Sequence, residues 1–202
     1  MNFTARNSKP SRPAPLPPAA NVKATRRVAS LYDRGEGKGA LLTVEREVRD
    51  AADDTHYATV RQMLLLRGDG GFGGTPAPKV EVAPVPDRAP DAREVVTISP
   101  RAALIYRLSG DLNPLHADPA FAKAAGFSRP ILHGLASYAI AGNAIMRATG
   151  GGIARLSCRF AGVVLPGSEM TVSIWRGGNE IMFEAHVGEQ RVLDQGRAIH
   201  AG

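Results

Sequence analysis

Cysteine is almost absent from this sequence, which contains a single one, Cys158. No disulfide framework can therefore hold the fold together, and a small disulfide-stapled secreted scaffold is excluded. One free thiol fits a reducing compartment, so the cytoplasm is the expected location. Because Cys158 lies in the middle of an apolar, strand-like pattern, we expect it to be a core residue and not a nucleophile.

Long apolar runs are also missing. No stretch approaches the roughly 18 residues that a membrane-spanning helix needs, so no membrane association is expected. The N-terminal MNFTARNSKP lacks the apolar core of a secretory signal, and the C-terminal AIHAG is not a peroxisomal address. The sequence therefore predicts neither an anchor nor a targeting segment.

Aromatic residues make up only 5% of the chain, although its formal net charge is +6. Nucleic-acid-binding proteins usually gather basic residues in a patch or motif, whereas here the arginines are scattered and no basic run is interleaved with aromatics. No nucleic-acid partner is expected. A basic surface suits a small polyanionic ligand equally well.

The first third of the chain changes composition at about residue 15. Proline, alanine and polar residues dominate residues 1–14, which we expect to form a disordered or extended tail. Residues 15–67 contain three strand-like runs separated by turn residues, and apolar and polar side chains alternate in the middle run from Leu42 onward. An antiparallel meander is predicted, with strands at 22–32, 40–50 and 56–67.

Glycine and proline crowd residues 68–92, a composition typical of a linker. The segment GDGGFGG within it has the glycine content of a phosphate-binding loop. No helix follows to supply the amide groups that such loops use, so a plain linker is the favoured interpretation.

Helical patterns occupy the middle of the remaining residues, 93–202. After a short strand, Ser99 and Pro100 are expected to begin a helix as its cap and first residue. Asp118 is expected to cap a second short helix. The alanine-rich, nearly uncharged run at 133–151 predicts a long buried helix.

Four strand-like runs follow the long helix, and Gly177–Gly178 predicts a hairpin turn between the second and third of them. A long buried helix followed by an antiparallel meander is typical of an α+β fold in which the sheet wraps the helix. The expected strands are 153–164, 169–176, 179–187 and 190–199.

One irregular segment, LSGDLNPLHADP, brings Asp111, Asn113 and His116 together around a proline. Pro114 removes a backbone donor and disfavours helical geometry at Asn113, so the segment is predicted to be a non-helical loop between two short helices. A carboxylate and an imidazole on such a loop can converge, and an amide can hold a water molecule or a carbonyl. Each residue alone has an ordinary structural explanation, but the three together point to acid–base chemistry.

Gly134 is expected at the start of the long helix. Helix N-termini present free N–H groups and the positive end of the dipole, and a glycine lets a ligand approach the backbone closely. The sequence therefore predicts an oxyanion-type site for a carbonyl at Gly134. A glycine that merely relieves crowding is the alternative.

Metal binding is a further alternative for the same loop. The His-x-Asp order at residues 116–118 has the spacing of a two-histidine, one-carboxylate iron site, with His133 or His186 as the third ligand. That pattern usually lies on a strand, whereas Asp118 is well placed to cap a helix. No metal ion is therefore expected.

Two motifs carry a resemblance to a known family. YRLSGDLNPLH at 106–116, with PILHGL at 130–135, resembles the hydratase 2 motif of the MaoC-like (R)-specific enoyl-CoA hydratases. RFAGVVLPGSEM at 159–170 is similar to the family's strand after the central helix. The resemblance implies a hot-dog fold, an antiparallel sheet wrapped around a long central helix, with residues 93–202 as the catalytic domain.

The N-terminal half resembles only part of the corresponding half of two-domain family members, which are double hot dogs. Residues 15–67 are similar to the last three strands of a first hot dog. The resemblance therefore implies a partial first hot dog and a complete second one, as in an N-terminally truncated member. An open edge strand and an uncovered apolar face would result, so we expect self-association, most simply as a homodimer.

The resemblance also implies a reaction, the reversible addition of water to a trans-2-enoyl-CoA to give a (3R)-3-hydroxyacyl-CoA. The coenzyme A thioester is the substrate, and no cofactor is expected. By the family pattern, Asp111 and His116 share the water and the proton transfer, and Asn113 positions the water. The backbone N–H of Gly134 polarises the thioester carbonyl.

Substrate contacts follow from the same resemblance. Phe160 matches a family position beside the ligand, and Arg34 falls where two-domain members place a basic residue near coenzyme A; a solvated turn residue is the alternative for Arg34. The loop residues assigned to substrate binding are Leu112, Pro114 and Leu115. A non-catalytic acyl-CoA-binding or interaction module, derived from a truncated hydratase, is the alternative function. A hot-dog thioesterase is disfavoured by the motif.

Overall fold

The computed structural model describes residues 14–78 and 84–201, and the chain divides into two compact units between Val82 and Ala83. Of the predicted tail at 1–14, only Ala14 falls within the described residues; its N–H donates to the main-chain oxygen of His56. Among the described residues, no helix has the length and apolar character that crossing a membrane requires.

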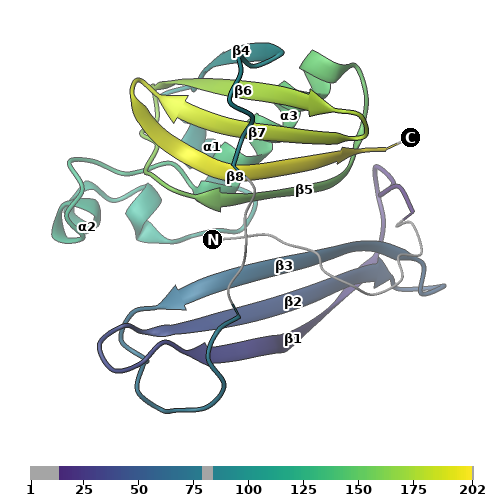
Figure 1. Ribbon diagram of the computed structural model, residues 1–202. Helices are drawn as coiled ribbons and strands as arrows, with labels where there is room; N and C mark the ends of the chain where they lie inside the picture. Colours follow the sequence, from purple (N-terminus) through teal and green to yellow (C-terminus); the bar gives the residue numbers. More distant parts are fainter. Residues whose placement is uncertain (1–13, 79–83, 202) are drawn as a thin grey trace. The chain divides into compact units, whose positions relative to one another are not determined.

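The first unit contains a three-stranded antiparallel sheet in the order β1-β2-β3 (Figure 1). The strands are β1 (Val22–Asp33), β2 (Ala40–Asp50) and β3 (His56–Leu66), so the predicted meander is confirmed to within a residue at each end. Its central strand is β2, which pairs with both neighbours along nearly its whole length.

An ion-pair triad crosses one face of this sheet. Glu45 on β2 is only 4% exposed, and its carboxylate bonds Arg27 on β1 and Arg61 on β3. Burial raises the pKa of Glu45, but the hydrogen bonds and charges of the two arginines outweigh burial and hold it below its usual value. The carboxylate therefore stays ionised inside the sheet.

The opposite face of the sheet carries exposed apolar side chains beside two exposed arginines, Arg26 and Arg46. Val28 is 64% exposed, Leu31 is 49% exposed and Val60 is 37% exposed. An isolated sheet of three strands gains stability mainly when its apolar face is covered. This face therefore has the character of a surface that packs against another layer.

The glycine-rich segment after β3 folds back onto the end of β1. The Asp33 carboxylate accepts the N–H groups of Gly35 and Gly71, both at 2.8 Å, and of Gly73. These bonds hold the pKa of Asp33 below its usual value. GDGGFGG does cradle an anion, but the anion is a side chain of the same chain, which explains the turn-rich composition without a phosphate.

The second unit contains a five-stranded antiparallel sheet in the order β4-β6-β7-β8-β5, which curves in front of the long helix α3 (Gly134–Thr149) in Figure 1. Buried residues of α3, including Ala141, Ala144 and Ile145, join Phe183 and other sheet residues in one core. The predicted α+β hot dog is thus confirmed. Its strands are β4 (Ala92–Thr97), β5 (Ile153–Phe160), β6 (Glu169–Gly177), β7 (Glu180–Val187) and β8 (Gln190–His200).

The short helices of this unit are α1 (Ala102–Arg107) and α2 (Pro119–Ala124). The predicted start of α1 was wrong, because Arg101 occupies the N-cap position. The main-chain oxygen of Ser99 accepts the N–H of Ala102, and its hydroxyl accepts the N–H of Arg101, so a turn precedes the helix. For α2, the capping prediction was right.

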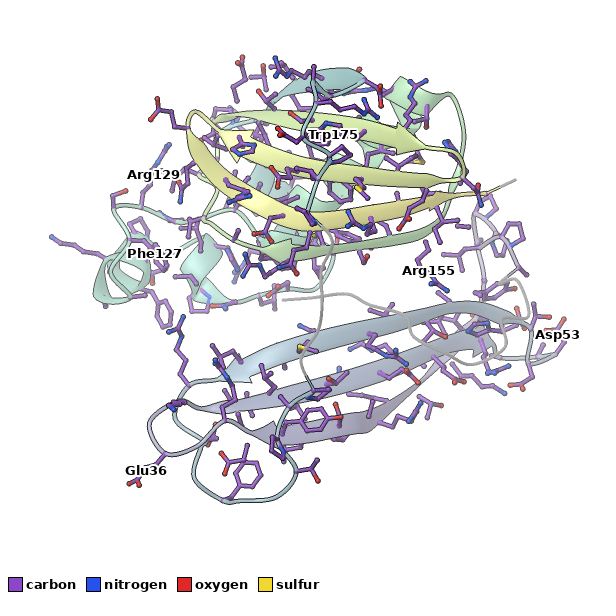
Figure 2. All side chains as sticks on the ribbon, viewed as in Figure 1. Glu36, Asp53, Phe127, Arg129, Arg155 and Trp175 are labelled. Atoms are coloured by element: carbon purple, nitrogen blue, oxygen red, sulfur yellow. The ribbon has the colours of Figure 1, made fainter. Side chains whose placement is uncertain are left out.

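The chain just before β4 is fixed to the outside of the sheet. The indole N–H of Trp175, labelled in Figure 2, donates to the main-chain oxygen of Arg88 at 2.9 Å. Arg88 forms a two-pronged ion pair with Asp91, which also accepts the N–H of Arg176. These contacts lower the pKa of Asp91 to about 2. The last part of the linker-like segment is therefore held against β6 by hydrogen bonds and is not a free linker.

Candidate active site

The loop between α1 and α2 begins with a turn that only glycine adopts comfortably. Gly110 has φ = +101°, a left-handed conformation that strains residues with a side chain. The next residue, Asp111, is exposed, and its carboxylate accepts the N–H of Asn113 at 3.3 Å. The turn at Gly110 thus lets the chain reverse after α1 and present a carboxylate at the surface of the unit.

A single turn of 3₁₀ helix, η1 (Pro114–His116), follows within the loop, so the prediction that the loop contains no helix was wrong. Pro114 occupies its first position, where a missing N–H costs nothing and the fixed φ fits. The side-chain oxygen of Asn113 caps the turn by accepting the N–H of Leu115 at 3.0 Å. The proline that breaks an α-helix here starts a shorter one.

Two hydrogen bonds tie η1 to the segment that leads into α3. The N–H of Ile131 donates to the main-chain oxygen of Leu115 at 3.3 Å, and Nδ1 of His116 lies 2.8 Å from the main-chain oxygen of Ile131. A carbonyl oxygen only accepts, so Nδ1 of His116 carries the proton. In the neutral ring, Nε2 is then the basic nitrogen.

His133, the N-cap residue of α3, completes a compact cluster. Its ring stacks on His116 with centroids 3.7 Å apart and an interplanar angle of 26°, and the ring of Tyr106 lies 4.7 Å away on a tilt. Its Nε2 donates to the main-chain oxygen of Asp111 at 3.3 Å. Burial lowers the pKa of His133, and the neighbouring His116 lowers it further.

The start of α3 lies beside an aromatic ring from the sheet. Gly134 is the first residue of the helix, and a Cβ added to it would come within 3.1 Å of the ring of Phe160 on β5. The first N–H groups of a helix have no carbonyl partner within it. Gly134 is exposed, and the Phe160 ring lies on the side where its Cβ would be.

The structure brings the predicted acid–base residues together. One carboxylate oxygen of Asp111, one ring nitrogen of His116 and one of His133 all lie within 4.8 Å of one another. Burial raises the pKa of Tyr106 beside this cluster, and the charge of Asp111 adds to the effect. The site is therefore a carboxylate and an imidazole next to the N-terminus of a helix.

The same three residues are also the candidate metal ligands among the described residues. Their arrangement suits a metal ion poorly. Ring lone pairs lie in the ring planes, so two stacked imidazoles direct them side by side and do not converge on one ion. Asp118, the carboxylate of the alternative iron site, caps α2 by accepting two N–H groups.

The remaining predicted residues are distributed between the two units. Leu112 and Pro114 are exposed on the loop, and Leu115 is half-buried. Arg34 belongs to the first unit, where it follows β1 in the turn to β2 and its side chain contacts the main-chain oxygen of Lys38 at 3.4 Å. Its predicted role near coenzyme A concerns both units and stays a prediction.

His133 was considered in the sequence only as a metal ligand, and Tyr106 was given no role. The signal that could have found His133 is its place directly before the glycine that starts α3. An N-cap residue lies next to the free amides of the first turn, so a polar ring there is a candidate for shaping a site at those amides.

Comparison with known proteins places this geometry in context. Residues 81–196, more than half of the chain, match the family model described as MaoC like domain. The chain is 44% identical over 168 residues to 3-hydroxyacyl-thioester dehydratase Y of Mycobacterium tuberculosis, covering 81% of this chain and 58% of that protein. It is 34% identical to a peroxisomal enoyl-CoA hydratase 2 of Arabidopsis thaliana, covering 87% of this chain and 60% of the relative.

Solved structures agree in fold. The crystal structure of a MaoC-like dehydratase from Phytophthora capsici superposes with a TM-score of 0.80 at 32% identity, covering 89% of this chain and 64% of that one. This chain therefore spans a little under two thirds of the length of each of these relatives.

Proposed function

This chain belongs to the MaoC-like domain family, and on that premise we propose that it hydrates trans-2-enoyl-CoA reversibly to (3R)-3-hydroxyacyl-CoA. The observation that carries the proposal is the approach of the Asp111 carboxylate to the His116 imidazole, within 4.8 Å, next to the start of α3. Adding water to a conjugated thioester requires an acid and a base on one face of the double bond and stabilisation of enolate charge.

The chemistry divides among a few groups. Asp111 and His116 share the water. One of them removes a proton from the water as its oxygen bonds to the β-carbon of the enoyl group, and the other delivers a proton to the α-carbon of that group. Because Nδ1 of His116 is bonded to Ile131, the imidazole acts through Nε2. The N–H of Gly134 stabilises the negative charge that develops on the thioester oxygen. No cofactor is needed for these steps.

Substrate contacts surround the pair. Asn113 uses its side-chain oxygen to cap η1, so its amide NH₂ is the end that positions the water. Phe160 lines the thioester site next to Gly134, and Arg34 contributes positive charge for the coenzyme A phosphates. The loop residues that contact the acyl group are Leu112, Pro114 and Leu115.

The domain assignment and the assembly belong to the same proposal. Residues 93–202 carry the catalytic groups, and residues 15–67 form the partial first hot dog. The exposed valines and leucine of the three-stranded sheet support a homodimer that covers them. Light scattering tests this directly, and a monomer at micromolar concentration would contradict it.

A cytoplasmic location rests on the single free cysteine, and microscopy of the tagged full chain tests it.

The test of the activity uses crotonyl-CoA and a longer enoyl-CoA, with loss of absorbance of the conjugated thioester as the signal. Asp111→Asn and His116→Gln should each lower kcat by about 10²–10⁴-fold, the usual contribution of an acid–base group, while circular dichroism stays unchanged. Full activity in both variants would refute the assignment. Binding of crotonyl-CoA without turnover by the wild type would instead support the non-catalytic acyl-CoA module.

A further inference from the structure

His133 is a polar residue in a place that packing alone does not explain. Its side chain is 1% exposed, and its Nδ1 is buried without a hydrogen-bond partner among the described residues. A buried acceptor left unpaired destabilises the folded state, and an apolar ring of similar size would avoid that cost. The other nitrogen of the ring must therefore provide something that an apolar ring cannot.

The second nitrogen and the ring face contact the two halves of the proposed acid–base pair. Nε2–H donates to the main-chain oxygen of Asp111 at 3.3 Å, and the ring stacks on His116 at 3.7 Å. Because His133 precedes the first residue of α3, the contact joins the loop to a helix of 16 residues. The His133 side chain thus contacts both Asp111 and His116 from a position at the start of α3.

We propose that His133 is a positioning residue, which fixes the main chain of Asp111 so that its carboxylate faces His116 across the reacting carbons. This inference rests on the proposed hydratase function. The decisive contact is the Nε2–H bond to Asp111, since Asp111 lies on an exposed loop that follows a left-handed glycine. The stacked ring supplies the surface on which His116 rests.

The surroundings of His133 favour the neutral ring, in the first place because the ring is buried. Arg107 on α1 and His116 on η1 both oppose a positive charge on it, whereas the Asp111 carboxylate favours one, and Tyr106 packs against its face. A proton on Nδ1 would find no acceptor. The neutral tautomer with the proton on Nε2 keeps its bond to Asp111.

Two matched substitutions separate the hydrogen bond from packing. His133→Phe keeps an aromatic ring and loses the donor, and His133→Gln keeps an N–H donor at similar reach and loses the ring. We expect His133→Phe to lower kcat for crotonyl-CoA by about 10–10²-fold, since an ångström of misplacement costs this much, with KM within about threefold. His133→Gln should recover most of the loss. Equal losses in both variants, or full activity in His133→Phe, would overturn the proposal.

A double-mutant cycle tests whether His133 acts through Asp111. In the Asp111→Asn background, His133→Phe should cost less than about threefold, because residues that act as a unit are not additive. A purely structural residue would instead lower activity by the same factor in both backgrounds, which would contradict the inference.

Hydrogen exchange distinguishes this inference from the proposed function. Amides of the 110–116 loop should exchange faster in His133→Phe than in the wild type and His133→Gln, with or without hydratase activity. An inactive wild type with this exchange pattern would refute the hydratase and leave the positioning contact standing. An active wild type with unchanged exchange and unchanged kcat in His133→Phe would refute the positioning role alone.

Discussion

Nδ1 of His116 lies 2.8 Å from the main-chain oxygen of Ile131, so the segment that leads into α3 also orients the imidazole of the proposed acid–base pair. Ile131 is only three residues before Gly134, whose amide is the proposed oxyanion donor. The imidazole and the amide are therefore positioned by one short piece of chain, and a change in that segment should disturb both together.

Removing the amide of Gly134 should abolish most of the activity without unfolding the helix. Gly134→Pro deletes the N–H at a first helical position, where proline is well accepted, and His133 already has the extended backbone that proline prefers before it. Loss of one oxyanion donor costs about 10²–10³-fold in kcat.

Gly134→Ala is the matched control, because it keeps the N–H and adds only the Cβ near Phe160. Steady-state kinetics of the two variants should show the proline variant far less active. If both lose the same factor, crowding against Phe160 explains the glycine and the oxyanion role is refuted.

Substitutions at Asn113 should separate capping from water positioning. Asn113→Asp keeps an oxygen that can accept the Leu115 N–H and loses the NH₂ group, whereas Asn113→Ala loses both. We expect Asn113→Asp to keep the melting temperature and lose about 10-fold or more in kcat, and Asn113→Ala to lose at least as much activity. Wild-type turnover by Asn113→Asp would remove the amide from the mechanism.

Stability should fall on mild acidification partly because of His133. Its folded-state pKa is lowered, whereas in the unfolded chain a histidine titrates near pH ~6.5. As the pH falls, this histidine therefore takes up a proton in the unfolded chain before it does so in the folded protein. Its contribution to the free energy of unfolding is fully present above about pH 6.5 and is lost as the pH falls through the folded-state pKa. Urea unfolding between about pH 7.5 and 5.5 should show that the free energy of unfolding falls more steeply with pH in the wild type than in His133→Phe. Parallel profiles would contradict this.

Cys158 should be chemically silent in the folded protein. The thiol is 3% exposed, and burial raises its pKa to about 12. A colorimetric thiol reagent should therefore react with Cys158 slowly in native buffer and rapidly in denaturant. Cys158→Ala should retain hydration activity. Fast native labelling that inactivates the protein would point to a thiol in the mechanism.

Local patterns were sufficient for the strands and the long helix. Alternation around Val44 and the turn at Gly178 predicted β2 and the β6–β7 hairpin, because side-chain period and turn chemistry are encoded in neighbouring residues. The helix start at Ser99 failed, since the choice between a turn and a first helical residue depends on how the chain leaves β4.

Contacts between distant residues were out of reach of the sequence. GDGGFGG was interpreted as a linker because its anion, Asp33, lies 38 residues before Gly71. His133 was missed for the same reason, as its partner Asp111 precedes it by 22 residues. For Asp111 and His116 the motif was short enough for the loop itself to predict their approach.

The carboxylate of Glu45 favours one register of the three-stranded sheet. Arg27 and Arg61 sit directly opposite it on the two flanking strands. If either flanking strand slid by one residue, its arginine would turn to the other face and leave a buried anion with half its counter-charge. A meander in a shifted register would therefore be less stable than the native one on electrostatic grounds alone.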